Sequence, residues 1–378
     1  MSRLSSRLRF FLAVALLLVA VILRLWDFTT LPPGYADPEI TDVQLAETVR
    51  AGDISVFYDL GDEGREGLYH TLQALIAAFI GNGTIGYRIL SVWANLIALA
   101  LVYALGRRLF GPVAGLAAMA LLAVSLYPVL LSRQITQTTM IPFLVAVVLL
   151  GLATATPIYR RRRKSGDTTT AVTILGFFLG ISLYIHPIGL LLILLSMLFI
   201  AYMIRSSQPM SNRRISYLAF AVLLMVILSM PYMISSIRNP QLGGMERLTG
   251  EELSINVENI VAAARSIVSN GDENPFNNLP GQALFDPLSG VLILIGMGIS
   301  LFRWREPKHT LLILASIILM PVFLLASTAP NFPNYAASLP LLALFFGLGV
   351  ATLSQYLRRF GPYIAVIFVA VFIGFKAD

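Results

Sequence analysis

The stretch Leu31–His70 reads LPPGYADPEITDVQLAETVRAGDISVFYDLGDEGREGLYH and is a polar, acidic segment between apolar runs. Together with Asp27, just before it, it holds ten of the chain's 20 acidic residues. Elsewhere the chain is apolar: of its 378 residues 57% are hydrophobic and 12% charged, and the mean hydropathy is +0.78. A soluble chain carries about twice that share of charge. The composition predicts an all-α polytopic membrane protein with this stretch as an exposed loop.

The charge pattern and the absence of cysteine narrow the function classes. The net charge is +7, but the basic residues stand in short clusters between apolar runs. That pattern is typical of membrane anchoring and does not indicate a nucleic-acid surface. With no cysteine in the chain, thiolate nucleophiles, disulfides and cysteine metal sites are excluded.

Eleven apolar runs are long enough, or nearly so, to cross a bilayer, which takes roughly 20 residues. The first starts after a basic segment and shows no small-residue cleavage site, so we interpret it as a retained helix and not as a signal peptide. Arg24, near its outer end, is expected to extend to the membrane interface. The predicted spans are 8–26, 85–105, 112–131, 139–158, 170–187, 188–205, 215–236, 288–302, 310–327, 336–357 and 362–375.

The positive-inside rule fixes the expected orientation. If the short apolar run 67–80 lies on the outer surface as a juxtamembrane helix, 18 of the 27 basic residues fall on the inner side and 17 of the 20 acidic residues on the outer side. We therefore predict a single domain over 1–378, multi-pass in the plasma membrane, with a cytoplasmic amino terminus. The outer segments are then 27–84, 132–138, 238–287 and 328–335, and the first of them carries juxtamembrane helices.

Two further outer helices are predicted. In the first loop, Asp37-Pro38 has the pattern of a helix start, with Asp37 at the N-cap, and the helix runs to about Arg50 before Gly52. Glu39 and Asp42, three apart, share one face of it. These acids have two explanations: a structural one, in which they cap the helix and interact favourably with its dipole, and a functional one. In the second loop, Glu251–Val268 is amphipathic, with an apolar side of Ile260, Val261, Ala264, Ile267 and Val268.

At this point the chain resembles a family. The resemblance is carried in order by Pro-Pro-Gly followed by acids, Gly-Arg-Glu with Leu-Tyr-His, Tyr87-Arg88, ALGRRLF, Ser132-Arg133, GDEN with NNLPG and Asp-Pro, and Leu339-Pro340. This series is similar to the bacterial GT-C membrane glycosyltransferases, in particular the dolichyl-phosphate-mannose–protein mannosyltransferase-like group, family 39. The sequence departs from that pattern where Pro38 separates Asp37 from Glu39 and where Gly67 and Gln137 stand in place of a proline and a basic residue.

The resemblance implies an enzyme that moves a sugar, with inversion, from a polyprenyl-phosphate-linked donor to a lipid, glycan or protein acceptor at the outer face. A carboxylate of the first outer loop is then the general base, because it takes the acceptor's proton as the new bond forms. Arginines hold the carrier phosphate. The predicted catalytic residues are Glu39 and Asp37, and the predicted substrate-binding residues are Asp42, Arg65, Glu66, His70, Arg133 and His186.

Two other function classes stay open. A GT-C-like chain without transferase activity would act as a subunit or scaffold of a membrane complex, and a lipid or solute transporter would need charged or broken helices at mid-membrane depth. The three first-loop acids Asp37, Glu39 and Asp42 offer oxygen ligands for a divalent cation. Such clusters are common, however, so no metal or cofactor is assigned. Membrane lipids, and in the scaffold case other membrane subunits, are the expected partners; nucleic acid is not.

Overall fold

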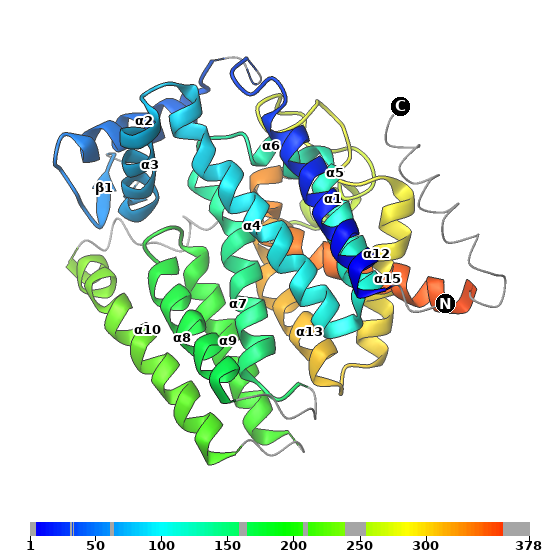
Figure 1. Cartoon of the computed structure of the whole chain (residues 1–378). Coiled ribbons are helices and arrows are strands. Elements are labelled where there is room, and N and C mark those ends of the chain that lie inside the picture. Colours follow the sequence, from blue (N-terminus) through cyan, green and yellow to red (C-terminus); the bar gives the residue numbers. More distant parts are fainter. Residues whose placement is uncertain are drawn as a thin grey trace.

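The computed structural model describes residues 5–30, 32, 34–60, 64–158, 165–206, 211–238 and 255–357. Within these ranges the protein is helical apart from one small hairpin, and the long helices pack side by side (Figure 1). The first half contains α1 (Ser6–Leu25), α2 (Asp37–Arg50), β1 (Phe57–Asp59), β2 (Gly64–Glu66), α3 (Gly67–Ile80), α4 (Thr84–Phe110), α5 (Pro112–Val124), α6 (Leu126–Leu131), η1 (Gln137–Met140), α7 (Ile141–Ala155) and α8 (Ser165–Ser182). The second half contains α9 (Ile188–Arg205), α10 (Asn212–Arg238), α11 (Val257–Arg265), α12 (Pro287–Phe302), α13 (Pro307–Leu319), α14 (Pro321–Leu324), η4 (Phe332–Tyr335) and α15 (Leu339–Leu357).

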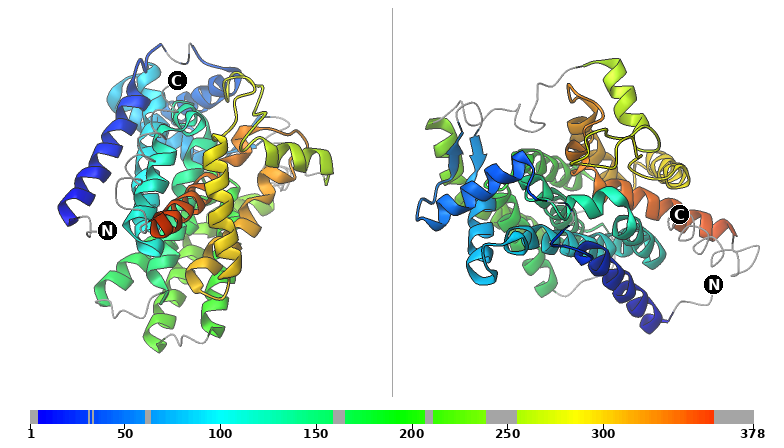
Figure 2. Two further views of the ribbon diagram at one scale, coloured as in Figure 1. Left: turned by 90° about the vertical axis from the view of Figure 1, so that its right-hand side faces the viewer. Right: turned by 90° about the horizontal axis from the view of Figure 1, so that it is seen from above.

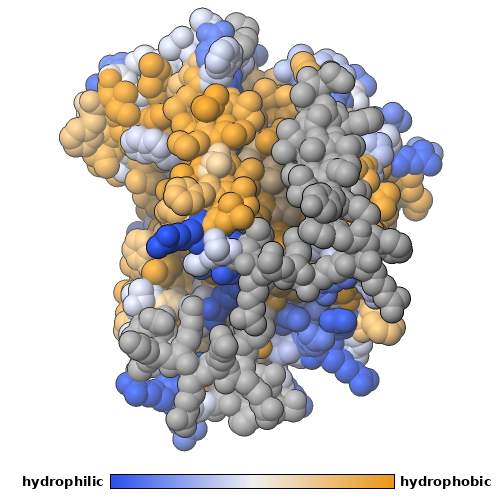
Figure 3. Space-filling model, turned by 45° about the vertical axis from the view of Figure 1, so that its right-hand side comes forward, coloured by the Kyte–Doolittle hydropathy of each residue, from blue (hydrophilic) through white to orange (hydrophobic). Residues whose placement is uncertain are grey.

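The apolar runs of the sequence form the long helices. Over the described residues, seven helices are long and apolar enough to cross a membrane, and four shorter apolar helices accompany them. Ten predicted spans fall on helices; the eleventh, 362–375, lies outside the described residues. Large apolar side chains point outward from α1. Figure 3 shows a broad apolar area on the upper part of the visible face, with hydrophilic residues above and below it. An exposed apolar area of this kind is what a bilayer covers, and the exact number of spans stays a prediction.

Close contacts at glycine hold the carboxyl-terminal helices together. A Cβ added at Gly296 of α12 would lie 2.0 Å from the backbone oxygen of Phe345 in α15. One added at Gly347 would lie 2.2 Å from the backbone oxygen of Ala114 in α5. Small residues let helix backbones approach closely, which is the main source of packing energy between helices in lipid. Figure 2 shows α15 crossing α12, as these contacts require.

Arg24 does not extend to the interface as predicted. It is 1% exposed, and its guanidinium donates to the backbone oxygens of Leu122 and Ala123 at 3.1 Å each. These carbonyls belong to the last turn of α5, where no intrahelical N–H is available to them. Arg24 stays inside the protein because it supplies hydrogen bonds to these two carbonyls where α1 packs on α5.

The predicted outer segments meet at one end of the helix bundle. Leu68 N–H donates to Tyr184 O at 3.0 Å, which joins the start of α3 to the α8–α9 turn. Phe332 N–H donates to a carboxylate oxygen of Asp272 at 2.9 Å and joins the third and fourth segments, of which 239–254 lies outside the described residues. Figure 1 shows α2, α3 and β1 gathered at that end. The grouping fits the charge argument, whereas the side of the membrane it faces stays a prediction.

The amphipathic helix of the second outer loop differs from its prediction in length and in face. The helix α11 covers Val257–Arg265 only, and Glu251–Ser254 lies outside the described residues. Its buried side is centred on Ala263, while Val261 and Ala264 are exposed. Ser266, the residue after α11, forms a hydrogen bond with the Tyr335 hydroxyl at 2.8 Å. This contact turns the Ala263 side of α11 inward.

The α12–α15 contact is tested by substituting two glycines of the same helix. Gly296→Ala forces a methyl group against the backbone of α15, and we expect the thermal midpoint in detergent to fall by several degrees, in line with an overpacking cost of about 1–3 kcal/mol. Gly298 has open space around its Cβ position. Gly298→Ala is therefore expected to leave the midpoint unchanged or raise it slightly; equal effects of the two substitutions would contradict the close contact.

Candidate active site beneath helix α2

The N-cap of helix α2 lies one residue before the predicted one, Asp37. Ala36 is the N-cap, and Asp37 and Pro38 occupy the first two helical positions. Glu39 is then the third residue, and its side chain accepts a hydrogen bond from Ala36 N–H at 3.1 Å. This contact is the carboxylate half of a capping box. The helix ends at Arg50 as expected, with Gly52 at a φ of +103°. Asp37 is exposed, whereas Glu39 and Asp42 are both 1% exposed and share the buried face.

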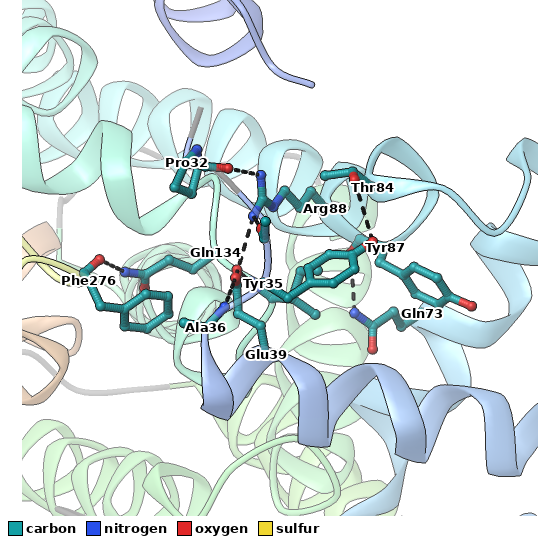
Figure 4. A network of polar contacts seen from close by, with 12 residues as sticks. Pro32, Tyr35, Ala36, Glu39, Gln73, Thr84, Tyr87, Arg88, Gln134 and Phe276 are labelled. Carbon is teal, nitrogen blue, oxygen red and sulfur yellow. Dashed lines mark hydrogen bonds and ion pairs between the residues drawn. The ribbon is translucent and has the colours of Figure 1, made fainter. Parts of the chain in front are cut away.

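Glu39 is held from three directions. Its Oε1 accepts from Ile135 N–H at 2.8 Å, and its Oε2 accepts from Ala36 N–H and lies 3.4 Å from the Arg88 guanidinium. Arg88, on α4, also donates to Pro32 O at 3.0 Å and Gly34 O at 2.6 Å. Figure 4 shows Arg88 between the entry turn and the start of α2. One buried guanidinium therefore fixes both the turn and the helix that follows it.

Further polar contacts join α2 to α3, α4 and the second outer loop. The Tyr87 hydroxyl donates to Glu47, and Gln73 donates to Tyr87 O at 3.2 Å. Gln134 donates to Phe276 O at 2.9 Å, which links the residues after α6 to the second outer loop. Figure 4 shows Gln73, Tyr87, Gln134 and Phe276 together with Glu39 and Arg88. These hydrogen bonds add to the apolar contacts of the loop elements, in which Leu45, Ala46 and Val49 of α2 share a buried cluster with Ala74 and Ala77 of α3.

The strands β1 and β2 bring Arg65 and Glu66 against α2. They pair antiparallel, with Tyr58 opposite Arg65. Gly67 then starts α3, where a Cβ would lie 1.8 Å from Ser55 O, and its N–H donates to Val56 O at 2.8 Å. Proline has a side chain and no N–H, so it would lose this bond and clash. The departure at Gly67 from the family pattern therefore has a local structural reason.

Four of the predicted substrate-binding residues come together beneath α2: Asp42, Arg65, Glu66 and His70. His70 Nε2 lies 3.7 Å from Asp42 Oδ1, and Arg65 interacts electrostatically with both of these side chains. Gln137 completes the group, because its amide donates to Glu66 O at 2.8 Å and lies 3.3 Å from His70 Nε2. Arg65 is half-buried, and the other members are buried. We call these five residues the α2–α3 cluster.

Burial sets the protonation states in the cluster. Removal from water raises the pKa of Asp42 to about 7; Arg65 opposes this shift and Glu39 adds to it. Burial, with Arg65 contributing, lowers the pKa of His70 to about 3, so its ring is neutral at pH 7. Among the described residues, no donor forms a hydrogen bond with Oδ1 of Asp42. The cluster thus contains a carboxyl group whose proton affinity matches neutral pH.

The other predicted site residues lie in separate environments. Arg133 donates to Leu23 O at 2.8 Å and to Trp26 O, so it caps the carboxyl end of α1. Burial and the nearby Arg88 lower the pKa of Arg133. His186, in the α8–α9 turn, accepts from Ile188 N–H at 3.1 Å. Their predicted roles in substrate binding stay predictions.

Sequence reasoning did not assign Arg88 or Gln137 to the site. Arg88 was quoted only as part of a motif that opens a span, and Gln137 only as a departure from a basic residue. Both are polar residues at the outer end of an apolar run, and such residues need partners in the adjoining loop. Across the described ranges, no three His, Asp or Glu side chains group as a metal site would require.

The fold and the site together define the class. The protein has the fold of the GT-C membrane glycosyltransferases, which confirms the resemblance found in the sequence. Residues 68–234 match the family model described as dolichyl-phosphate-mannose-protein mannosyltransferase. No match to the chain was found among curated proteins.

Solved structures share the fold at low sequence identity. ArnT from Cupriavidus metallidurans bound to undecaprenyl phosphate aligns with a TM-score of 0.64 and 14% identity, over 89% of this chain and 59% of its own. The apo oligosaccharyltransferase of Archaeoglobus fulgidus gives a TM-score of 0.61 and 14% identity, over 100% of this chain and 55% of its own. The archaeal AglB in complex with an inhibitory peptide and a dolichol-phosphate gives 0.61 and 13%, over 100% and 55%. The chain thus spans between half and two thirds of these proteins' length.

The structural role of Glu39 is tested by Glu39→Gln. The substitution removes the charge that faces Arg88 and turns an acceptor into a donor among N–H groups, so we expect a loss of about 3–5 kcal/mol in unfolding free energy. The measurement is thermal unfolding in detergent. Asp37→Asn, two residues away and exposed, should change stability by no more than about 0.5 kcal/mol. A smaller loss of stability in Glu39→Gln than in Asp37→Asn would contradict the role of Glu39 in holding α2 against Arg88.

The raised pKa of Asp42 predicts a pH effect on stability. Between the unfolded value, about 3.9, and the folded value of about 7, the folded state keeps a proton that the unfolded chain has lost. The free energy of unfolding therefore falls as pH rises through this window, by about 1.4 kcal/mol for each unit of pKa difference.

Asp42→Asn, which cannot ionise, removes this dependence. We expect the thermal midpoint of the variant, relative to that of the wild type at the same pH, to be higher at pH 8 than at pH 5. A constant difference would show that Asp42 titrates normally.

Proposed function

We propose that this protein transfers a sugar from a polyprenyl-phosphate-linked donor to an acceptor hydroxyl at the outer membrane face. The observation that carries the proposal is the α2–α3 cluster: carboxylates, an arginine and a neutral histidine in the first outer loop of a GT-C fold. The family description names a dolichyl-phosphate-linked mannose, and similar structures are described with undecaprenyl phosphate and dolichol-phosphate. The lipid-linked donor is inferred from these.

The cluster offers the chemistry that an inverting transfer needs. The acceptor oxygen forms a bond to the anomeric carbon while the bond from that carbon to the carrier phosphate breaks. The electron pair of the broken bond leaves with the polyprenyl phosphate, and the acceptor's proton passes to a carboxylate of the first outer loop. We assign the half-buried Arg65 to the carrier phosphate, because a guanidinium can pair with a phosphate as its negative charge grows. The sugar, hexose or pentose, and the acceptor, lipid, glycan or protein, belong to this proposal.

The location is part of the same proposal. The amino terminus is cytoplasmic and the chain is a multi-pass protein of the plasma membrane, so the cluster faces the extracytoplasmic side. The grouping of the outer segments at one end supports this arrangement. Reaction at that side would place the acceptor outside the cytoplasm.

A second candidate function is a subunit of a membrane complex without transferase activity. The observation in its favour is the full engagement of Glu39, the predicted base, by Ile135, Ala36 and Arg88. A scaffold would copurify in mild detergent with partners at fixed stoichiometry and would show no transfer.

Arg65→Ala tests the proposed enzyme. The variant loses the guanidinium placed at the donor phosphate, so we expect transfer from polyprenyl-phosphate-linked sugars to fall by about a hundredfold or more. The assay follows label from the donor into an acceptor, with purified full-length protein. Arg50→Ala is the control, since Arg50 is exposed on α2 and forms a surface ion pair with Glu47 at 2.8 Å. Equal activity of the Arg65→Ala variant and the wild type would rule out this role.

A further inference from the structure

A general base needs a carboxylate oxygen that can take up a proton. Helix α2 carries three candidates in its first six residues: Asp37, Glu39 and Asp42. They belong to one segment, but the structure gives each a different environment. Those environments, and not the spacing in the sequence, distinguish their chemistry.

Glu39 is committed as an acceptor. Two backbone N–H groups and the Arg88 guanidinium surround its oxygens. A proton on Glu39 would compete with a backbone donor for its oxygen and leave the buried Arg88 facing a neutral group. Proton uptake would therefore weaken the contact that holds α2 in place. Glu39 is suited to position the helix and poorly suited to exchange protons in each catalytic cycle.

Asp37 has no enclosed site around it. It is exposed at the first position of α2. Water is the competing nucleophile in sugar transfer, and an active site that excludes it prevents hydrolysis. A carboxylate open to solvent does not provide that exclusion.

Asp42 is buried and has a carboxylate oxygen that accepts no hydrogen bond from the described residues. Its side chain is buried under α2, and Oδ1 receives no hydrogen bond from the described residues, while the neutral His70 ring lies 3.7 Å away. We infer that Asp42 is the general base of the proposed transfer and that Glu39 is a positioning residue, which holds α2 so that Asp42 faces α3. This inference rests on the proposed function and assigns the base within it.

The charged and titratable groups around Asp42 fit this role. On β2, Arg65 favours the ionised form; on α2, Glu39 disfavours it; on α3, His70 is neutral and the buried Tyr69 senses the charge of Asp42. Glu66, also on β2, is buried in the same cluster. The resulting pKa of Asp42, about 7, is the range in which a base is both available and able to hold a proton.

The proposed step balances as follows. Ionised Asp42 takes the proton of the acceptor hydroxyl while the acceptor oxygen bonds to the anomeric carbon. The bond between that carbon and the phosphate oxygen breaks, and polyprenyl phosphate leaves with the electron pair. Asp42 then releases its proton to solvent. Nothing is oxidised or reduced.

The test compares Asp42→Asn, Glu39→Gln and Asp37→Asn in the full chain, with Asp53→Asn as a matched exposed control in the same loop. The probe is a panel of polyprenyl-phosphate-linked hexoses and pentoses, and transfer is measured from pH 5 to pH 9. We expect the wild-type rate to rise with pH through about 7. Asp42→Asn should lose about a hundredfold or more. Glu39→Gln should lower the thermal midpoint, keep a rate that rises with pH, and move that rise to lower pH, because the Glu39 charge disfavours the ionised form of Asp42.

The outcomes are separable. If the wild type transfers no sugar of the panel, the proposed function fails and this inference fails with it. If the wild type transfers and Asp42→Asn keeps more than about half of the rate, or Asp37→Asn loses more than it does, only the assignment of the base is overturned. Infrared difference spectra add a readout that needs no substrate: a carboxyl band titrating near pH 7 must be present in the wild type and absent in Asp42→Asn.

Discussion

The contact between Arg88 and the entry to α2 is the constraint on which the loop end of the molecule depends. Arg88 lies near the start of α4 and is fully buried, so its charge needs partners within the protein. Two backbone oxygens of the incoming turn and the Glu39 carboxylate accept from its two terminal nitrogens. Because those acceptors lie on both sides of the start of α2, the helix can dock on α3 in one register.

That register decides the chemistry of the loop. With Glu39 turned toward Arg88, the residue three positions later faces α3 and meets His70 and Arg65. The same packing that fixes Asp42 also removes it from water, and burial shifts its proton affinity toward neutral pH. The same docking of α2 therefore sets two different environments, one around Glu39, which holds the helix, and one around Asp42, whose pKa is raised, although the two carboxyl groups lie a single helical turn apart.

Different contacts join distant segments in the two parts of the molecule. Among the spans, apolar side chains gain nothing from leaving lipid, so close backbone approach at Gly296 and Gly347 supplies the packing. In the outer loops, hydrogen bonds from Arg88, Gln134 and Gln137 join segments that are far apart in the chain. The rigid membrane part presents helix ends, and the polar loops are assembled on them.

The sequence by itself determined the membrane class, the positions of the helices, the extent of α2 and the loop that holds the candidate site. These follow from composition, run length and charge distribution, which are local or additive along the chain. The resemblance of its motifs to the glycosyltransferase family pointed to Asp42, Arg65, Glu66 and His70 as candidate substrate-binding residues.

Only the tertiary structure decided which of these residues meet and what each does. Arg24 and Arg133 cap helix ends because particular carbonyls of α5 and α1 lie beside them, and no pattern in the sequence reports that proximity. Glu39 and Asp42 look alike in the sequence, being acids three apart on one helix. Glu39 accepts from Ile135 and faces Arg88, whereas Asp42 lies beside His70 without a hydrogen bond to it, and all three neighbours are distant in the chain. These surroundings separate a fixed acceptor from a carboxyl group whose pKa burial raises to about 7.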